Sequence, residues 1–276
     1  MREVTGNSSR EREDRLATEE PLEIRLAWPG RRAERLTVTM RTPGHDFELA
    51  AGFLFGEGLV GSAGDIHTVA YCNDHTLTAE QEFNVVTVEL DRPPPRDPVA
   101  RYDGPTAGSS ACGVCGKQSV DDVLGAAEAA LSPVAALPRP SRIVPAEVIA
   151  SLPDRLREAQ KVFSATGGLH AAALFDAEGA AVVVREDVGR HNAVDKVVGS
   201  RVLAGLETDL AVLCVSGRIG FELAQKAVAA GVDVIAAVGA PSSLAVQLAE
   251  RAGLCTVGFL REDRFVIYTE PDRIGV

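Results

Sequence analysis

The spacing of hydrophobic residues changes along this chain. Up to about residue 90 the apolar side chains mostly alternate with polar ones, as at Leu22, Ile24 and Leu26, which is the pattern of strands with one buried face. After residue 146, apolar runs of strand length alternate with segments of helical period. A proline-rich stretch separates the two patterns. The chain is therefore predicted to fold as a smaller α+β unit followed by an α/β unit.

The first pattern predicts four strands and one helix. The strands are expected at 22–28, 36–40, 66–71 and 84–90. Pro29-Gly30 turns the first two into a hairpin, and Asp46 caps the helix ahead of apolar residues at helical spacing.

The second pattern predicts six strands and three helices. The strands are expected at 171–175, 181–185, 210–215, 232–238, 256–260 and 265–269, and the helices at 192–203, 220–230 and 242–252. A turn signal at 176–179 makes the first two strands a hairpin. Because strand and helix alternate after it, we expect right-handed crossovers and a mainly parallel sheet with helices on both faces.

Four regions follow from these patterns. They are a disordered tail over 1–20, an N-terminal α+β domain over 21–135 that ends in a cysteine loop and its helix, a Pro-rich linker over 136–145, and an α/β domain over 146–276.

Charge and composition exclude several classes of protein. The 276 residues carry a formal net charge of −11, which repels polyanions, so we expect no nucleic-acid partner. No apolar run approaches the roughly 20 residues that span a bilayer, and the Arg- and Glu-rich N-terminus lacks the apolar region of a signal peptide. Five cysteines, an odd number, do not suggest a disulfide framework. A cytoplasmic protein without a membrane partner is expected.

Cys112 and Cys115 form a C-G-V-C pair in a glycine-rich loop, and three chemistries compete for it. A zinc site needs about four ligands, and only Cys72, near His75, is a plausible helper. Cys214 and Cys255, which lie in or beside apolar strands, read as small buried hydrophobic residues.

A thioredoxin-like dithiol would follow a strand directly and open a helix, whereas here a Gly/Ser-rich loop precedes the pair. A sulfur carrier suits a flexible loop, and Lys117 could hold a thiolate or persulfide anion.

Several polar turns follow strands of the second unit, where ligands bind in open α/β sheets. These turns lie at 185–196, 215–220 and 239–243, with a charged turn at 259–264 and a histidine at the start of a strand, His170. Helix N-terminal amides together with Arg190 and His191 could receive a phosphate. The turn at 215–220 has neither the spacing of a Walker loop nor that of a dinucleotide-binding fingerprint.

Taken together, these motifs resemble the FdhD/NarQ family, the formate dehydrogenase accessory sulfurtransferases. The matching segments are Arg41-Thr42-Pro43-Gly44-His45-Asp46 with Glu48-Leu49-Ala50, 110–117, 163–172, 186–196, Ser216-Gly217-Arg218, and Gly258-Phe259 with Arg261 and Arg264. They cover nearly the whole chain beyond its N-terminal tail.

The resemblance implies a sulfurtransferase that accepts persulfide sulfur from a cysteine desulfurase. It would pass that sulfur to the molybdenum of a bis(molybdopterin guanine dinucleotide) cofactor, bound as substrate, before the cofactor enters the formate dehydrogenase catalytic subunit. Cys112 maps to the persulfide carrier, and Cys115 would assist or relay. The resemblance also implies that the protein forms a homodimer.

The resemblance also implies where the cofactor binds. The segment assigned to cofactor binding maps to Phe259, Leu260, Arg261, Glu262, Asp263 and Arg264. The guanine nucleotides would lie at the sheet edge formed with these residues by His170, Arg190, His191, Ser216, Gly217 and Arg218.

The family's C-terminal domain resembles the cytidine deaminase fold, a three-layer α/β arrangement. Zinc deaminases use H-x-E with P-C-x-x-C, but here Ala172 stands in place of the glutamate and Ser216-Gly217-Arg218 in place of the cysteine pair. We therefore expect no intrinsic metal and no deamination.

Two alternatives from other classes stay open. One is a zinc-stabilised binding module that uses Cys72, Cys112, Cys115 and a histidine. The other is a nucleotide-binding chaperone that shields the cofactor without transferring sulfur.

Overall fold

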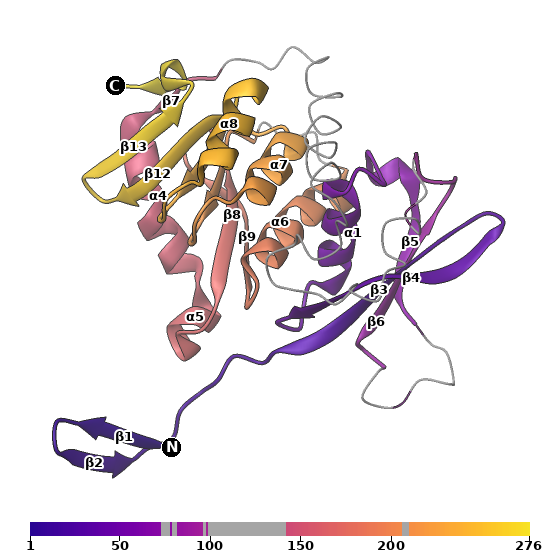
Figure 1. Ribbon diagram of the computed structural model, residues 1–276, viewed down its shortest axis with the longest axis horizontal. Helices are drawn as coiled ribbons and strands as arrows, with labels where there is room; N and C mark the ends of the chain where they lie inside the picture. Colours follow the sequence, from indigo (N-terminus) through magenta and orange to yellow (C-terminus); the bar gives the residue numbers. More distant parts are fainter. Residues whose placement is uncertain (73–77, 79–81, 96–97, 99–141, 206–209) are drawn as a thin grey trace.

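The structure of the chain is a computed structural model that describes residues 1–72, 78, 82–95, 98, 142–205 and 210–276. Cys112 and Cys115, the helix expected after them and most of the predicted linker lie outside the described residues. Figure 1 shows a four-stranded sheet with helix α1 beside it and a larger sheet flanked by helices.

The larger sheet contains six strands in the order β13-β12-β11-β10-β8-β9. Its strands are β8 (His170–Phe175), β9 (Ala181–Asp187), β10 (Val212–Val215), β11 (Val234–Ala237), β12 (Cys255–Arg261) and β13 (Arg264–Thr269). All six lie where the apolar runs predict them, within a few residues at each end.

The direction of the strands corrects the prediction of a mainly parallel sheet. Only β10–β11 and β11–β12 are parallel, whereas β8–β9, β8–β10 and β12–β13 are antiparallel. The turns after β8 and β12 are too short for a crossover, so they can join only antiparallel strands. The sheet is therefore mixed, with a parallel centre and an antiparallel hairpin at each edge.

Helices cover both faces of this sheet and make three layers. One face packs against α6 (Arg190–Ala204), α7 (Phe221–Ala230) and α8 (Ser243–Ala252), and the other packs against α4 (Ala146–Ala159). Successive residues of a strand point to opposite faces, so Leu213 joins the first core and Cys214 the second. A short helix, α5 (Lys161–Thr166), precedes β8. The arrangement supports the α/β class, and its likeness to cytidine deaminases stays a prediction.

The smaller sheet has the strand order β4-β3-β6-β5. Its elements are β3 (Glu20–Trp28), β4 (Arg31–Arg41), β5 (Ile66–Tyr71), β6 (Val85–Leu90), the helix α1 (Asp46–Gly56) and a 3-10 turn at Ala63–Asp65. Leu49 and Leu54 of α1 share one core with Leu22 and Ile24 of β3. Asp46 does not cap α1 as predicted: His45 occupies the cap position, and the Asp46 carboxylate binds Arg41 instead.

Helices α1 and α6 join the two sheets by direct backbone contact (Figure 1). A Cβ atom on Gly52 would lie 1.9 Å from the Asp195 carbonyl oxygen, and one on Gly199 would lie 1.8 Å from the Glu48 carbonyl oxygen. Both distances are far inside van der Waals contact, so only glycine allows the helices to approach this closely. The predicted domain boundaries stay a prediction, but the described parts pack as neighbours along this crossing.

The ends of the chain add two small sheets. Residues expected in the disordered tail instead form an antiparallel hairpin of β1 (Arg2–Thr5) and β2 (Ser8–Glu11), well separated from the larger sheet in Figure 1. At the other end a 3-10 turn at Pro271–Arg273 leads into β14 (Ile274–Gly275), which pairs with β7 (Val144–Pro145) just before α4. Among the helices that the structure describes, none is long and apolar enough to cross a membrane.

Candidate functional site

The turns that follow the parallel strands β10 and β11 meet each other and β12 at one edge of the larger sheet. The Gly239 amide donates to the Gly217 carbonyl at 2.9 Å, and the Phe259 amide donates to the Gly239 carbonyl at 3.0 Å. Ile219 and Pro241 form a further bridge between the first two turns. These contacts place the turns together, as the sequence predicts, and ligand binding at this edge stays a prediction.

The side chains of His170 and Arg190 both lie close to Gly217 at this edge. His170 begins β8, which runs antiparallel to β10, so it stands where β10 ends. A Cβ atom on Gly217 would lie 3.5 Å from His170 Nδ1 and 3.9 Å from Arg190 Cδ. Ser216 Oγ accepts from the Ala171 amide at 2.9 Å and ties the start of β8 to the end of β10. Arg218 is exposed, and its Cγ would lie 2.7 Å from a Cβ on Gly239.

The electrostatics at His170 favour a neutral ring beside a permanent cation. Burial lowers the pKa of His170, the nearby Arg190 guanidinium lowers it further, and the Asp187 carboxylate partly opposes both. At neutral pH the imidazole is therefore uncharged and can both donate and accept a hydrogen bond. The positive charge that would attract a phosphate comes from Arg190.

The segment from Phe259 to Arg264 divides into three parts. Phe259 has a left-handed backbone (φ 51°) and an exposed ring, whereas the Leu260 side chain is fully buried in the core. Arg261 Nη1 donates to the Val238 carbonyl at 2.9 Å and so reaches back to the end of β11. Glu262, Asp263 and Arg264 are exposed around the β12–β13 turn. Phe259 and Arg261 therefore stand near the meeting turns, and the Leu260 side chain faces away from solvent.

His191 does not face this edge. It is 9% exposed, and its Nε2 lies 3.2 Å from Glu222 Oε2 on α7. Adjacent residues of a helix point about 100° apart, so Arg190 can lie at the edge while His191 points toward the neighbouring helix. The structure thus separates two residues that the sequence grouped together.

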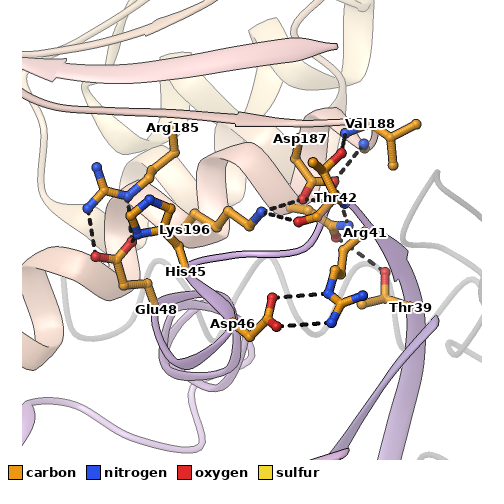
Figure 2. Close-up of polar contacts among 12 residues, drawn as sticks. Thr39, Arg41, Thr42, His45, Asp46, Glu48, Arg185, Asp187, Val188 and Lys196 are labelled. Atoms are coloured by element: carbon orange, nitrogen blue, oxygen red, sulfur yellow. Dashed lines mark hydrogen bonds and ion pairs between the residues drawn. The ribbon is translucent and has the colours of Figure 1, made fainter. Parts of the chain in front are cut away.

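A buried polar network just behind Arg190 was not foreseen from the sequence (Figure 2). Asp187, which is 0% exposed, accepts from four donors. Its Oδ1 accepts from the Gly189 amide at 2.8 Å and from Asn192 Nδ2 at 3.0 Å. Its Oδ2 accepts from the Thr42 amide at 3.2 Å and lies 2.7 Å from Lys196 Nζ. A buried carboxylate satisfied in this way fixes the turn between β9 and α6.

Two charged groups extend the network on the side of the smaller sheet. Arg41 makes two 3.0 Å hydrogen bonds to Asp46 and one of 2.9 Å to Asn84 Oδ1. The Tyr71 hydroxyl donates to Asp46 at 2.9 Å, and burial together with that carboxylate raises the pKa of Tyr71 to about 12. The start of α1 is thereby tied to β4, β5 and the residue before β6.

Glu48 makes the third connection between the sheets. Arg185 on β9 donates to both Glu48 carboxylate oxygens, at 2.5 and 2.6 Å. His45, in a left-handed backbone (φ 59°), places Nδ1 3.2 Å from the same carboxylate. Burial and the Arg185 charge lower the pKa of His45 despite the neighbouring Glu48. Figure 2 shows this group beside the Asp187 network.

One signal in the sequence could have revealed the network. The segments 41–46 and 186–196 each combine charged residues with turn residues. An aspartate just before a Val-Gly turn and a lysine nine residues later suggest a buried ion pair across that turn. Nothing in the spacing, however, indicates that Thr42 is their common partner.

The described cysteines agree with their predicted roles in the core. Cys214 and Cys255 are fully buried, and burial raises the pKa of each thiol to about 12. Cys72 is half-buried, and Arg25 Nη1 lies 3.8 Å from its sulfur. No group of three or more His, Cys, Asp or Glu side chains suited to a metal occurs among the residues that the structure describes. Cys112 and Cys115 lie outside them.

Comparisons with known proteins extend the likeness to nearly the whole chain. The model of the FdhD/NarQ family matches residues 17–275. Proteins named sulfur carrier protein FdhD are 50% identical in Streptomyces coelicolor, over 96% of this chain and 90% of that protein, and 49% identical in Mycolicibacterium paratuberculosis, over 99% and 96%. A crystal structure of a candidate formate dehydrogenase accessory protein from Desulfotalea psychrophila has the same fold, with a TM-score of 0.72, 24% identity, and coverage of 100% of this chain and 97% of that one.

Proposed function

The chain belongs to the FdhD/NarQ family, and from this premise we propose that it is a sulfur carrier that serves formate dehydrogenase. The observation that carries the proposal is its near-full-length similarity to relatives named sulfur carrier protein FdhD. Cys112 is the proposed carrier, with Cys115 assisting, because the two form the C-x-x-C pair of the sequence.

Two other cysteines support this choice, because neither offers an accessible thiolate. A carrier must react as a thiolate, and the raised pKa values of Cys214 and Cys255 keep both protonated at neutral pH. Their complete burial also shields them from a partner protein. Three of the five cysteines remain as candidates, namely Cys72, Cys112 and Cys115. The sulfur of Cys72 lies beside the Arg25 guanidinium.

The chemistry consists of two sulfur transfers. The Cys112 thiolate attacks the outer sulfur of a persulfide on a cysteine desulfurase, so the donor's S–S bond breaks, its thiolate leaves and a persulfide forms on Cys112. In the second transfer the outer sulfur moves to the molybdenum substrate, and the Cys112 thiolate is released. That sulfur becomes a sulfide ligand by taking two electrons, which a reduced molybdenum supplies.

The acceptor is proposed to bind through its guanine nucleotides at the sheet edge around His170, Arg190 and the Ser216–Arg218 turn. The chain as a whole repels anions, with a net charge of −11, so a nucleotide diphosphate needs a local cation. Arg190 and the exposed Arg218 supply one at the turns that meet there. The neutral His170 ring offers a hydrogen bond without a competing charge.

The zinc alternative is less well supported by the residues described. It needs Cys72 as a ligand, yet Arg25 lies 3.8 Å from the Cys72 sulfur and would place a cation beside the metal. Zinc content measured in purified protein and in Cys112→Ala protein separates the two hypotheses. Stoichiometric zinc that disappears in the variant would favour the binding module.

Mass spectrometry after incubation with a cysteine desulfurase and cysteine tests the carrier directly. The chain should gain about 32 Da, the mass of one sulfur, on Cys112. Cys112→Ala should abolish the gain, whereas the matched control Cys214→Ala, which removes a buried thiol, should keep it. A gain that persists in Cys112→Ala would place the carrier elsewhere.

Complementation of a strain that lacks the native carrier separates transfer from shielding. Cys112→Ala should abolish formate dehydrogenase activity if sulfur transfer is required. Full activity with this variant would instead support a chaperone that only binds the cofactor, and would overturn the carrier hypothesis.

A further inference from the structure

We propose that Thr42 is a positioning residue that clamps the turn between β9 and α6 and thereby sets where Arg190 lies against His170. This inference rests on the proposed function in one respect, which is that Arg190 and His170 face the bound nucleotide. It assigns a role to the segment Arg41-Thr42-Pro43-Gly44, which the sulfur chemistry leaves unused.

Every polar group of Thr42 is engaged with the larger sheet and its helix. Its amide donates to Asp187 Oδ2 at 3.2 Å, and its carbonyl accepts from Lys196 Nζ at 2.8 Å. Its hydroxyl oxygen accepts from the Val188 amide at 3.1 Å. Thr42 therefore contacts the last residue of β9, the turn itself and the second turn of α6, as Figure 2 shows.

The clamp is rigid on both sides. Pro43 restricts the residue before it to an extended backbone, so Thr42 presents its three groups without losing much conformational freedom. On the other side Asn192 Nδ2 donates both to Asp187 Oδ1 and to the Met40 carbonyl, the latter at 2.7 Å. Lys196 and Asp187 are at most 1% exposed, so water does not weaken the contact.

The clamped turn leads directly into the candidate site. Gly189 is the cap of α6, and Arg190 is the first residue of that helix. Asp187 is also the register partner of His170 across the β8–β9 ladder. A shift of the turn would therefore move Arg190 relative to His170, and the relative position of these two side chains would determine how a phosphate binds.

Thr42→Val tests the inference without changing charge or size. It removes the acceptor for the Val188 amide and leaves the backbone bonds in place. Thr37→Val makes the same chemical change on β4 outside the clamp, and Ile24→Val gives a comparable loss of stability in the core of the smaller sheet. Two measurements are made on each full-length variant: calorimetric binding of guanosine diphosphate and NMR titration of the His170 ring, which is tractable with five histidines.

Thr42→Val should weaken binding of guanosine diphosphate about three- to ten-fold, the size of one lost hydrogen bond. It should also raise the pKa of His170 toward its ordinary value, because Arg190 is no longer held close. Both control variants should match the wild-type protein in both measurements.

The His170 titration decides the inference and needs no ligand. If Thr42→Val titrates like the wild-type protein, Thr42 does not position Arg190 and the inference is overturned, whatever the affinity. If the wild-type protein fails to bind guanosine diphosphate, the nucleotide part of the proposed function fails, and the titration still decides the role of Thr42.

Discussion

Two buried acid–lysine pairs meet at helix α6, and they are built differently. Lys196 pairs with Asp187 at the start of the helix, while its neighbour Asp195 pairs with Lys226 of α7 at 2.6 Å. Asp187 accepts from two backbone amides and two side chains. Among the hydrogen bonds between described residues, the Asp195 carboxylate accepts one, from Lys226. The Asp187 carboxylate is therefore fully hydrogen-bonded, whereas the Asp195 carboxylate is bonded mainly to its lysine.

The difference separates a structural role from a titrating one. A buried carboxylate with several donors is stabilised in its charged form and fixes the groups around it. For Asp195 the largest influence is burial, which raises the pKa of its carboxyl to about 6, although the nearby Lys226 charge lowers it. The Asp187 pair is thus expected to determine local geometry, and the Asp195 pair to respond to pH.

The largest expected effect comes from Asp187→Asn. The new amide group would face donors that the carboxylate accepted, and Lys196 would lose its counter-ion inside the protein. We expect the free energy of unfolding to fall by about 3–5 kcal/mol at pH 7.

Asp195→Asn is the matched control for that experiment. Its amide oxygen can still accept from Lys226, whose charge also interacts with Glu57 and Glu222, and the neutral amide does not bear the cost of a buried charge, so no loss of stability is expected at pH 7. Urea unfolding of the two variants measures both values. Equal losses would show that the number of donors on Asp187 does not matter.

A smaller effect is expected from the titration of Asp195. Its folded-state pKa of about 6 exceeds the value of 3.8 taken for the unfolded chain. The stability it contributes is therefore fully present below about pH 4 and is lost as pH rises through about 6, by about 2–3 kcal/mol. The wild-type protein should lose this stability relative to Asp195→Asn between pH 4.5 and 7.5. A difference that stays constant over this range would contradict the prediction.

Periodicity predicted most of the fold but not how its parts meet. The six strands of the larger sheet and three of its helices lie where the apolar pattern placed them. The pattern does not predict helix α4, because Pro153 stands inside it and proline normally argues against a helix interior. The strand directions were misjudged because alternation of strand and helix describes only the centre of the sheet, β10 to β12.

The site shows the same limit of sequence reasoning. The pattern located His170, Arg190 and Gly217 as residues at strand ends, and the structure brings these three together. His191 was grouped with them because it follows Arg190, although a helix turns adjacent side chains apart. Thr42 lies more than 140 residues from Asp187, and no periodicity reports a contact over that separation.

The smallest effect is expected when the Asp195 pair is replaced by apolar residues of similar shape, Asp195→Leu with Lys226→Met. Replacing both members of a buried pair removes two desolvation costs and leaves few donors without acceptors, so the free energy of unfolding should stay within about 1 kcal/mol of the wild-type value. The same exchange at Asp187 and Lys196 should be far more costly, because the Thr42 and Gly189 amides would lose their acceptor inside the protein. Urea unfolding of the two double variants compares them directly, and similar losses would mean that the backbone donors around Asp187 find other acceptors.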